Sequence, residues 1–158
     1  MKVFTTLPQD DLKKVPAAAA AAEDAGYDGL MTLENRHDPF LPLAVAATAT
    51  RRIALLTGVA IAFPRSPMVI ANLGWDLQSA SDGRFVLGLG SQVRGHNERR
   101  FSLSWSAPAP RMRAHPVQTL FADQGGEIQH VPRVGVVIAH EVLHGELAGG
   151  IRVAPVVH

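Results

Sequence analysis

The sequence predicts an α/β fold in which four parallel strands and their helices form part of a (β/α)8 (TIM) barrel. Strand-like and helix-like segments alternate, and the strand-like segments begin about 25 to 30 residues apart. A parallel neighbour needs a crossover connection, which the intervening helices would supply. The predicted strands cover residues 2–6, 29–33, 53–62 and 84–90, and the predicted helices cover residues 11–25, 39–50 and 67–81.

Local sequence signals justify the predicted helices. The first is rich in alanine, has Pro16 near its start and has Gly26 just past its end, which is typical helix punctuation. The second is a short alanine-rich segment. The third carries apolar residues at Val69, Ile70, Leu73 and Leu77, a spacing that favours one buried helical face.

A barrel segment fits better than a doubly wound, dinucleotide-binding sheet. That sheet would carry a glycine fingerprint directly after the first strand. Residues 7–11 contain no glycine. Gly88 and Gly90 could begin the fingerprint G-x-G-x-x-G, but its third glycine position is occupied by Val93. A complete (β/α)8 barrel needs about 250 residues, so 158 residues predict only part of one.

Composition narrows the classes of function. The formal net charge is +1, which gives no electrostatic reason to expect nucleic acid or an anionic membrane as a partner. The absence of cysteine excludes disulfides, thiolate nucleophiles and cysteine-ligated metals. No apolar run approaches the roughly 20 residues of a membrane span, so we expect a cytoplasmic protein.

The barrel pattern stops after Arg113. Pro116 would break the next helix in its first turn, and no further strand–helix unit fits into the remaining residues. We therefore divide the chain into a half-barrel at residues 1–113 and an atypical tail at residues 114–158. Two interpretations of the tail are a poorly ordered segment and a segment translated in a shifted reading frame of GC-rich DNA.

Several segments in a fixed order carry a family-like sequence: residues 22–30, 34–39, 52–60, 81–91, 98–101 and 108–113. Together they resemble the bacterial luciferase-like monooxygenase family, and particularly its branch that uses coenzyme F420, a deazaflavin. The order and spacing of the segments carry the resemblance more than any one of them does. It implies the first four strands of a TIM barrel and a flavin- or deazaflavin-dependent oxidoreductase or monooxygenase acting on a small molecule.

The resemblance also implies a site. His37 would lie near the reactive face of coenzyme F420, or of FMN as the alternative cofactor, where an imidazole could orient or exchange a proton. Gly58 and Val59 match the position of a non-proline cis peptide behind the ring. The residues expected to contact the cofactor are Thr57, Gly58, Val59, Gly90, Ser91 and Gln92.

The roles of four charged residues stay open. Glu34 could supply a proton, as could Glu98, but a salt bridge from Glu34 to Arg36 or Arg65 is slightly favoured. Arg99 and Arg100 could meet an anionic substrate or the cofactor tail, although exposed arginines are more often solvated.

One motif in the tail supports a rival function. His140, Glu141 and His144 form H-E-x-x-H, which on a helix could hold zinc with the glutamate as base. A zinc hydrolase would need a third ligand, and only 14 residues follow His144. We therefore expect no metal site, and zinc ligation by His140 and His144 stays an alternative.

Another alternative is a non-catalytic half-barrel subunit. Strands one and four would have unpaired edges, which favour self-association, and two copies could close one barrel. Barrel phosphate sites come from the loops after strands seven and eight, so we expect weak cofactor binding and no activity from this chain alone.

Overall fold

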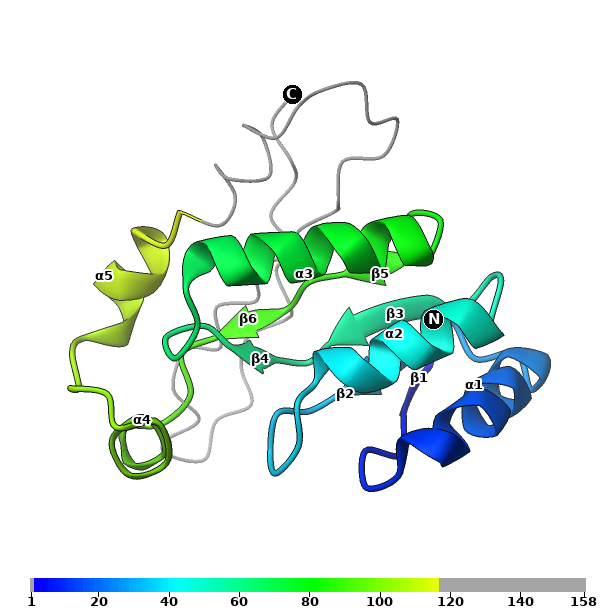
Figure 1. The fold of residues 1–158 in the computed structure, drawn as a ribbon, viewed down its shortest axis with the longest axis horizontal. Coiled ribbons are helices and arrows are strands. Elements are labelled where there is room, and N and C mark those ends of the chain that lie inside the picture. The colour runs from blue at the N-terminus through cyan, green and yellow to red at the C-terminus, as the bar shows by residue number, and fades with distance from the viewer. Residues whose placement is uncertain (1, 117–158) are drawn as a thin grey trace.

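The computed structural model describes residues 2–116 and confirms the parallel α/β architecture. A four-stranded parallel sheet has the order β1-β2-β3-β5, and a second parallel pair joins β4 to β6. Figure 1 shows α1, α2 and α3 side by side across one face of this sheet. The strands are β1 (Phe4–Thr6), β2 (Gly29–Thr32), β3 (Ala54–Thr57), β4 (Ala60–Ile61), β5 (Phe85–Val86) and β6 (Leu89–Gly90).

The helices lie close to the predicted ranges. The first prediction covers a short 3-10 helix followed by α1, and the next two correspond to α2 and α3. Residues 98–101, one of the segments that carry the family resemblance, belong to α4. The helical elements are η1 (Leu12–Lys14), α1 (Val15–Asp24), α2 (Phe40–Ala49), α3 (Pro67–Ala80), α4 (Arg94–Phe101) and α5 (Pro108–Arg113).

The end of α1 shows why Gly26 was a reliable signal. Gly26 has φ +84°, a left-handed conformation that glycine adopts without steric cost. The Gly26 N–H donates to the Glu23 carbonyl at 3.1 Å, and the Tyr27 N–H reaches back to the Ala22 carbonyl at 3.2 Å. These bonds satisfy carbonyls at the helix end and turn the chain into β2.

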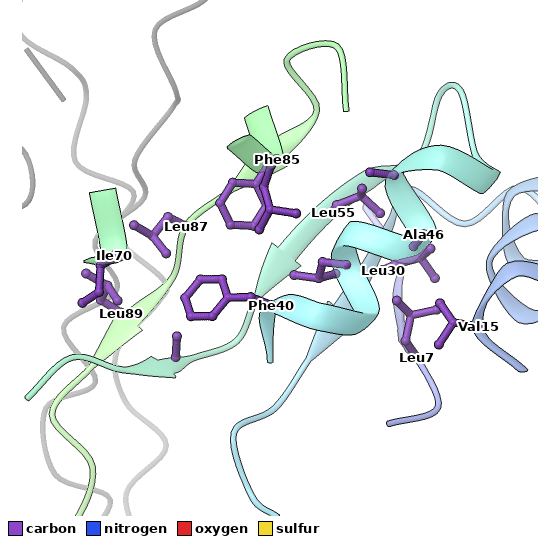
Figure 2. Close-up of a cluster of buried hydrophobic side chains, with 14 of the residues drawn as sticks. Leu7, Val15, Leu30, Phe40, Ala46, Leu55, Ile70, Phe85, Leu87 and Leu89 are labelled. Atoms are coloured by element: carbon purple, nitrogen blue, oxygen red, sulfur yellow. The ribbon is translucent and has the colours of Figure 1, made fainter. Parts of the chain in front are cut away.

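The hydrophobic core lies between the sheet and the helices. Leu30, Leu55 and Phe85 occupy one row of the strand register and are at most 1% exposed. Phe40 and Leu43 of α2 cover that row, and Figure 2 shows Phe40 beside Leu30 and Leu55. The predicted strands at residues 29–33, 53–62 and 84–90 supply the three strand side chains of this row.

The third and fourth predicted strands are each interrupted, which corrects the expectation of continuous strands at residues 53–62 and 84–90. The third run divides into β3 and β4, with Gly58 and Val59 between them, and the fourth divides into β5 and β6. The two interruptions lie side by side because β3 pairs with β5 and β4 pairs with β6. The hydropathy pattern of the sequence cannot reveal such an interruption, because the residues before and after it are apolar.

Glu23 fixes the connection from α2 to β3. Its carboxylate accepts hydrogen bonds from the backbone N–H groups of Arg51, Arg52 and Ile53, at donor–oxygen distances between 2.6 and 3.2 Å. Burial by itself would raise the pKa of the Glu23 carboxyl, but these three backbone donors and the charge of Arg52 lower it below its usual 4.5.

We expect Glu23 to make stability depend on pH. Because its pKa is lowered in the folded state, its contribution is fully present above pH 4.5 and is lost as the pH falls further, through the lowered pKa. The melting temperature of wild type should therefore exceed that of Glu23→Gln at pH 7, and the difference should shrink between pH 5 and pH 3. Thermal unfolding followed by circular dichroism tests this, with the exposed Asp24→Asn as control. A constant difference across that range would refute the assignment.

Candidate functional site at the carboxyl ends of the strands

The candidate site residues gather at one edge of the sheet. The strands are parallel, so the loops that follow them lie at the same end of the half-barrel. The loop after β2 carries His37, the interruption between β3 and β4 carries Gly58 and Val59, and β6 runs into Ser91 and Gln92. Carboxyl ends of barrel strands are where TIM-barrel active sites are built.

The interruption at Gly58–Val59 is held by its neighbour strand. The peptide bond between Gly58 and Val59 is cis, as the resemblance implied. The Thr57 hydroxyl donates to the Gly88 carbonyl at 2.7 Å and accepts from the Gly88 N–H at 2.8 Å. The Ala60 N–H then donates to the same carbonyl at 2.8 Å. One side chain therefore bridges the point where the two ladders are broken.

Gly88 has no room for a side chain at this point. A Cβ atom there would collide with the carbonyl oxygen of Thr57. Gly58 is also covered, because the Met31 sulfur occupies the place where its Cβ would lie. The two glycines let neighbouring strands come close enough for the Thr57 bridge to form.

A buried ion pair ties the loop after β2 to the loop after β4. The Arg65 guanidinium donates to both carboxylate oxygens of Glu34, at 2.7 and 2.9 Å. The backbone N–H of Ile61 donates to the same carboxylate at 2.6 Å. The side chains of Arg65 and Glu34 are 16% and 4% exposed. Of the two partners that the sequence offered Glu34, the structure selects Arg65.

The same arginine orders the segment next to His37. Arg65 also contacts Asp38 at 3.2 Å and lies 5.4 Å from the centre of the Phe40 ring. Burial alone would lower the pKa of the Arg65 guanidinium, but Glu34 and Asp38 raise it above its usual value. Asp38 in turn accepts from the backbone N–H groups of Phe40 and Leu41 at the start of α2. The loop is therefore fixed on both sides of His37.

His37 itself is exposed at this edge. Within residues 2–116 its side chain makes no hydrogen bond or ion pair, so the imidazole is free to meet a ligand. Glu34 is engaged through both oxygens, and Glu98 pairs with Arg94 at 2.9 Å. Of the proposed proton carriers, His37 is the one without such a partner in the described part of the chain.

The loop after β6 depends on a residue that the sequence did not reveal. Asn97 of α4 is 1% exposed, and its amide donates to the carbonyls of Ser91 and Val93 at 2.9 and 3.1 Å. Gln92 between them has φ +57°. Within residues 2–116, the backbone N–H groups of Ser91 and Gln92 donate no backbone hydrogen bond, and Ser91 is 8% exposed. An asparagine among basic residues gave no signal of this role.

The two arginines near the end of α4 differ in their surroundings. Arg100 donates to the backbone carbonyl of Asn35, which brings α4 against the loop that carries His37. Arg100 also stacks on Phe101, with 5.2 Å between the guanidinium carbon and the ring centre. Arg99 is exposed and has no ion pair within the described residues. Contact of either arginine with an anionic ligand stays a prediction.

The alternative metal site is not tested by the structure. Within residues 2–116, no three histidine, aspartate or glutamate side chains cluster in a way that could hold a metal ion. His140, Glu141 and His144 lie outside the described residues, as does most of the predicted tail. No helix in the described part of the chain is long and apolar enough to cross a membrane.

Comparison with known sequences identifies relatives over the same region. The profile of the luciferase-like monooxygenase family matches residues 2–115. An uncharacterized protein of Mycobacterium tuberculosis is 51% identical over 113 residues, which are 72% of this chain and 33% of that protein. A putative coenzyme F420-dependent oxidoreductase of the same organism is 42% identical over 72 residues, or 45% of this chain and 21% of that protein.

Solved structures agree on the fold. A monooxygenase from Streptomyces bottropensis superposes with a TM-score of 0.66 at 22% identity, covering 77% of this chain and 42% of that one. A coenzyme F420-dependent tetrahydromethanopterin reductase from Methanopyrus kandleri gives a TM-score of 0.58 at 24% identity, covering 66% of this chain and 30% of that one. The chain spans about a third of the length of the first curated relatives that it matches.

Proposed function

Because the chain belongs to the luciferase-like monooxygenase family, we propose that it forms the N-terminal half of an oxidoreductase site for coenzyme F420, with FMN as the alternative cofactor. The family includes flavin- and F420-dependent oxidoreductases. The observation that carries the proposal is the meeting of three segments at one sheet edge: the His37 loop, the Gly58–Val59 interruption and the Ser91–Gln92 loop.

The residues present fit a planar, carbonyl-bearing ring. Gly58 and Val59 are half-buried and uncharged, so they offer an apolar surface of low relief. The backbone N–H groups of Ser91 and Gln92 could donate to ring carbonyls or to an anionic ring. When bound, the deazaflavin would supply hydride transfer. The role of the protein would be to orient the ring and to exclude water from it.

His37 would exchange a proton near the reacting atoms. It is exposed, it lies on a loop fixed by Arg65 and Asp38, and it has no competing partner among residues 2–116. A positioned histidine of this kind contributes about 10²- to 10⁴-fold to a rate. Glu34 would not share this role, because Arg65 and Ile61 engage its carboxylate.

Titration of the chain into coenzyme F420, and separately into FMN, tests the proposal through cofactor fluorescence. We expect saturable quenching that is stronger for F420, although binding should be weak because the chain spans only a third of its curated relatives. Val59→Asp would place a charge against the ring and should weaken binding at least tenfold. Val69→Asp, on the exposed surface of α3, is the matched control and should leave binding unchanged.

A second arm tests His37 separately from binding. His37→Asn should leave the cofactor dissociation constant within threefold of wild type. In a preparation that reduces the cofactor, the same substitution should lower the single-turnover rate by about 100-fold or more. If the chain quenched the fluorescence of neither F420 nor FMN, the proposed site would be refuted. An unchanged rate in His37→Asn would refute only the role of the histidine.

A further inference from the structure

Basic side chains gather where α4 meets the loop after β2. Arg100 of α4 donates to the Asn35 carbonyl, and Arg36 begins at that same peptide group. His96 precedes Arg100 by four residues in the helix, so the two side chains are neighbours on its surface. We call Arg36, His37, His96 and Arg100 the basic cluster. All four residues are exposed, so molecules in solution can reach them.

No carboxylate among residues 2–116 forms an ion pair with the basic cluster. Both carboxylates of the loop after β2 are engaged by Arg65, which lies 2.7 Å from Glu34 and 3.2 Å from Asp38. Glu98, the acidic residue of α4, pairs instead with Arg94 at 2.9 Å. The positive charge of the cluster is therefore not compensated by the loop or the helix that carries it.

The adjoining loop after β1 does not compensate this charge either. The Leu33 N–H donates to the Gln9 side chain at 3.1 Å, which joins that loop to the one carrying the cluster. Its two carboxylates are used locally, because Asp10 pairs with Lys14 at 3.6 Å and Asp11 caps the start of η1. A surface that concentrates one sign of charge attracts ligands of the opposite sign and raises their local concentration.

The Arg100 side chain is held in place by two contacts. Its guanidinium donates to the Asn35 carbonyl and stacks on the Phe101 ring, with 5.2 Å between the guanidinium carbon and the ring centre. Its other N–H groups meet no acceptor within residues 2–116. A guanidinium presents its donors as a planar fork that matches two oxygens of a carboxylate or a phosphate. Arg100 is therefore preorganised to bind an oxyanion.

We propose that Arg36 and Arg100 bind a carboxylate or phosphate group of the substrate, next to His37. This inference rests on the proposed function and adds the chemical class of the substrate, a small molecule that carries an oxyanion. Both candidate cofactors also carry phosphate, at the far end of a flexible chain from the ring. We assign the cluster to the substrate because it includes His37, whose proposed role is proton exchange at the reacting atoms.

Inorganic phosphate is the probe for this site, added at constant ionic strength to the full 158-residue chain. We expect the Nε–H signals of Arg36 and Arg100 in nitrogen–proton NMR spectra to shift saturably, whereas chloride should cause no saturable shift. Arg100→Gln removes a charge-assisted hydrogen bond and should weaken phosphate binding by about tenfold or more. Arg94→Gln, on the same helix but paired with Glu98, is the matched control and should change binding by less than about twofold.

A second variant separates ligand binding from the docking of α4. Arg100→Gln also removes the contact with the Asn35 carbonyl, so Arg36→Gln is measured independently. Arg36 makes no hydrogen bond or ion pair within residues 2–116, so its replacement should leave the circular dichroism spectrum and the melting temperature unchanged. It should still weaken phosphate binding by about fivefold or more. Wild-type phosphate binding in both variants would overturn the proposal.

Riboflavin and FMN distinguish a substrate oxyanion from the cofactor phosphate, because they share a ring and differ in the phosphate. We expect Arg100→Gln to change the dissociation constants of both flavins by less than about twofold. A loss of affinity confined to FMN would mean that the cofactor phosphate occupies the cluster, which would overturn the substrate assignment.

The oxyanion site and the proposed function can fail separately. Phosphate binding without quenching of F420 or FMN fluorescence would refute the proposed function and leave the oxyanion site supported. Quenching of cofactor fluorescence by a chain that binds no phosphate would refute the oxyanion site alone.

Discussion

Replacing Gly88 with alanine is expected to destabilise the folded half-barrel by about 3 kcal/mol or more, at the upper end of the range for forcing extra volume into a packed core. The added Cβ would collide with the Thr57 carbonyl oxygen, which is backbone and cannot rotate away. The Thr57 hydroxyl also fixes both the N–H and the carbonyl of Gly88. Relief of the clash would therefore break the bridge between the two interrupted strands. Urea unfolding followed by circular dichroism measures the loss.

Gly95→Ala is the matched control for this change. Gly95 lies in α4, and a Cβ there would meet nothing within 4 Å. Alanine in a helix restricts the unfolded chain without strain, so we expect stability to rise by about 0.5–1 kcal/mol. If Gly88→Ala unfolded at the same urea concentration as the wild type, the close approach of β3 to β5 and β6 at the Thr57 bridge would be refuted.

The elements that periodicity could predict are those whose burial is regular. The α3 helix was predicted from the helical spacing of Val69, Ile70, Leu73 and Leu77. Ile70 and Leu77 are buried as expected, but Val69 is 50% exposed. Parallel strands were predicted because strand-like segments alternate with helix-like segments at a regular interval. The interruptions at Gly58 and Gly88 escaped this reasoning, because they depend on contacts between strands that are about 30 positions apart in sequence.

The family resemblance predicted which residues lie at the candidate site. It did not predict the contacts of those residues that depend on how the helices and loops pack. The cis bond at Gly58–Val59 is present, and His37 lies on the expected loop. The Glu34–Arg65 pair was one of two alternatives, and distance alone could choose between them. The role of Asn97 could not be predicted, because it depends on how α4 folds back onto the carbonyls of Ser91 and Val93.

Replacing Arg65 with methionine is expected to cost about 3–5 kcal/mol, because it leaves the buried Glu34 carboxylate without its counter-ion. The Ile61 N–H would remain as its one hydrogen-bond donor in the described structure. A surface pair gives the contrast: Arg94 and Glu98 have side chains 67% and 37% exposed. Arg94→Met should therefore change stability by less than about 1 kcal/mol.

The double variant Glu34→Gln with Arg65→Met separates the ion pair from the packing around it. Removing both charges should recover part of the stability lost in Arg65→Met, since an unpaired buried carboxylate costs more than a neutral amide in the same place. Chemical denaturation of the four proteins in this cycle measures the coupling. The loss of unfolding free energy in the double variant could instead equal the sum of the losses in the two single variants. In that case the loss in Arg65→Met would come from packing against Phe40, and the Glu34 carboxylate would not be what holds the His37 loop in place.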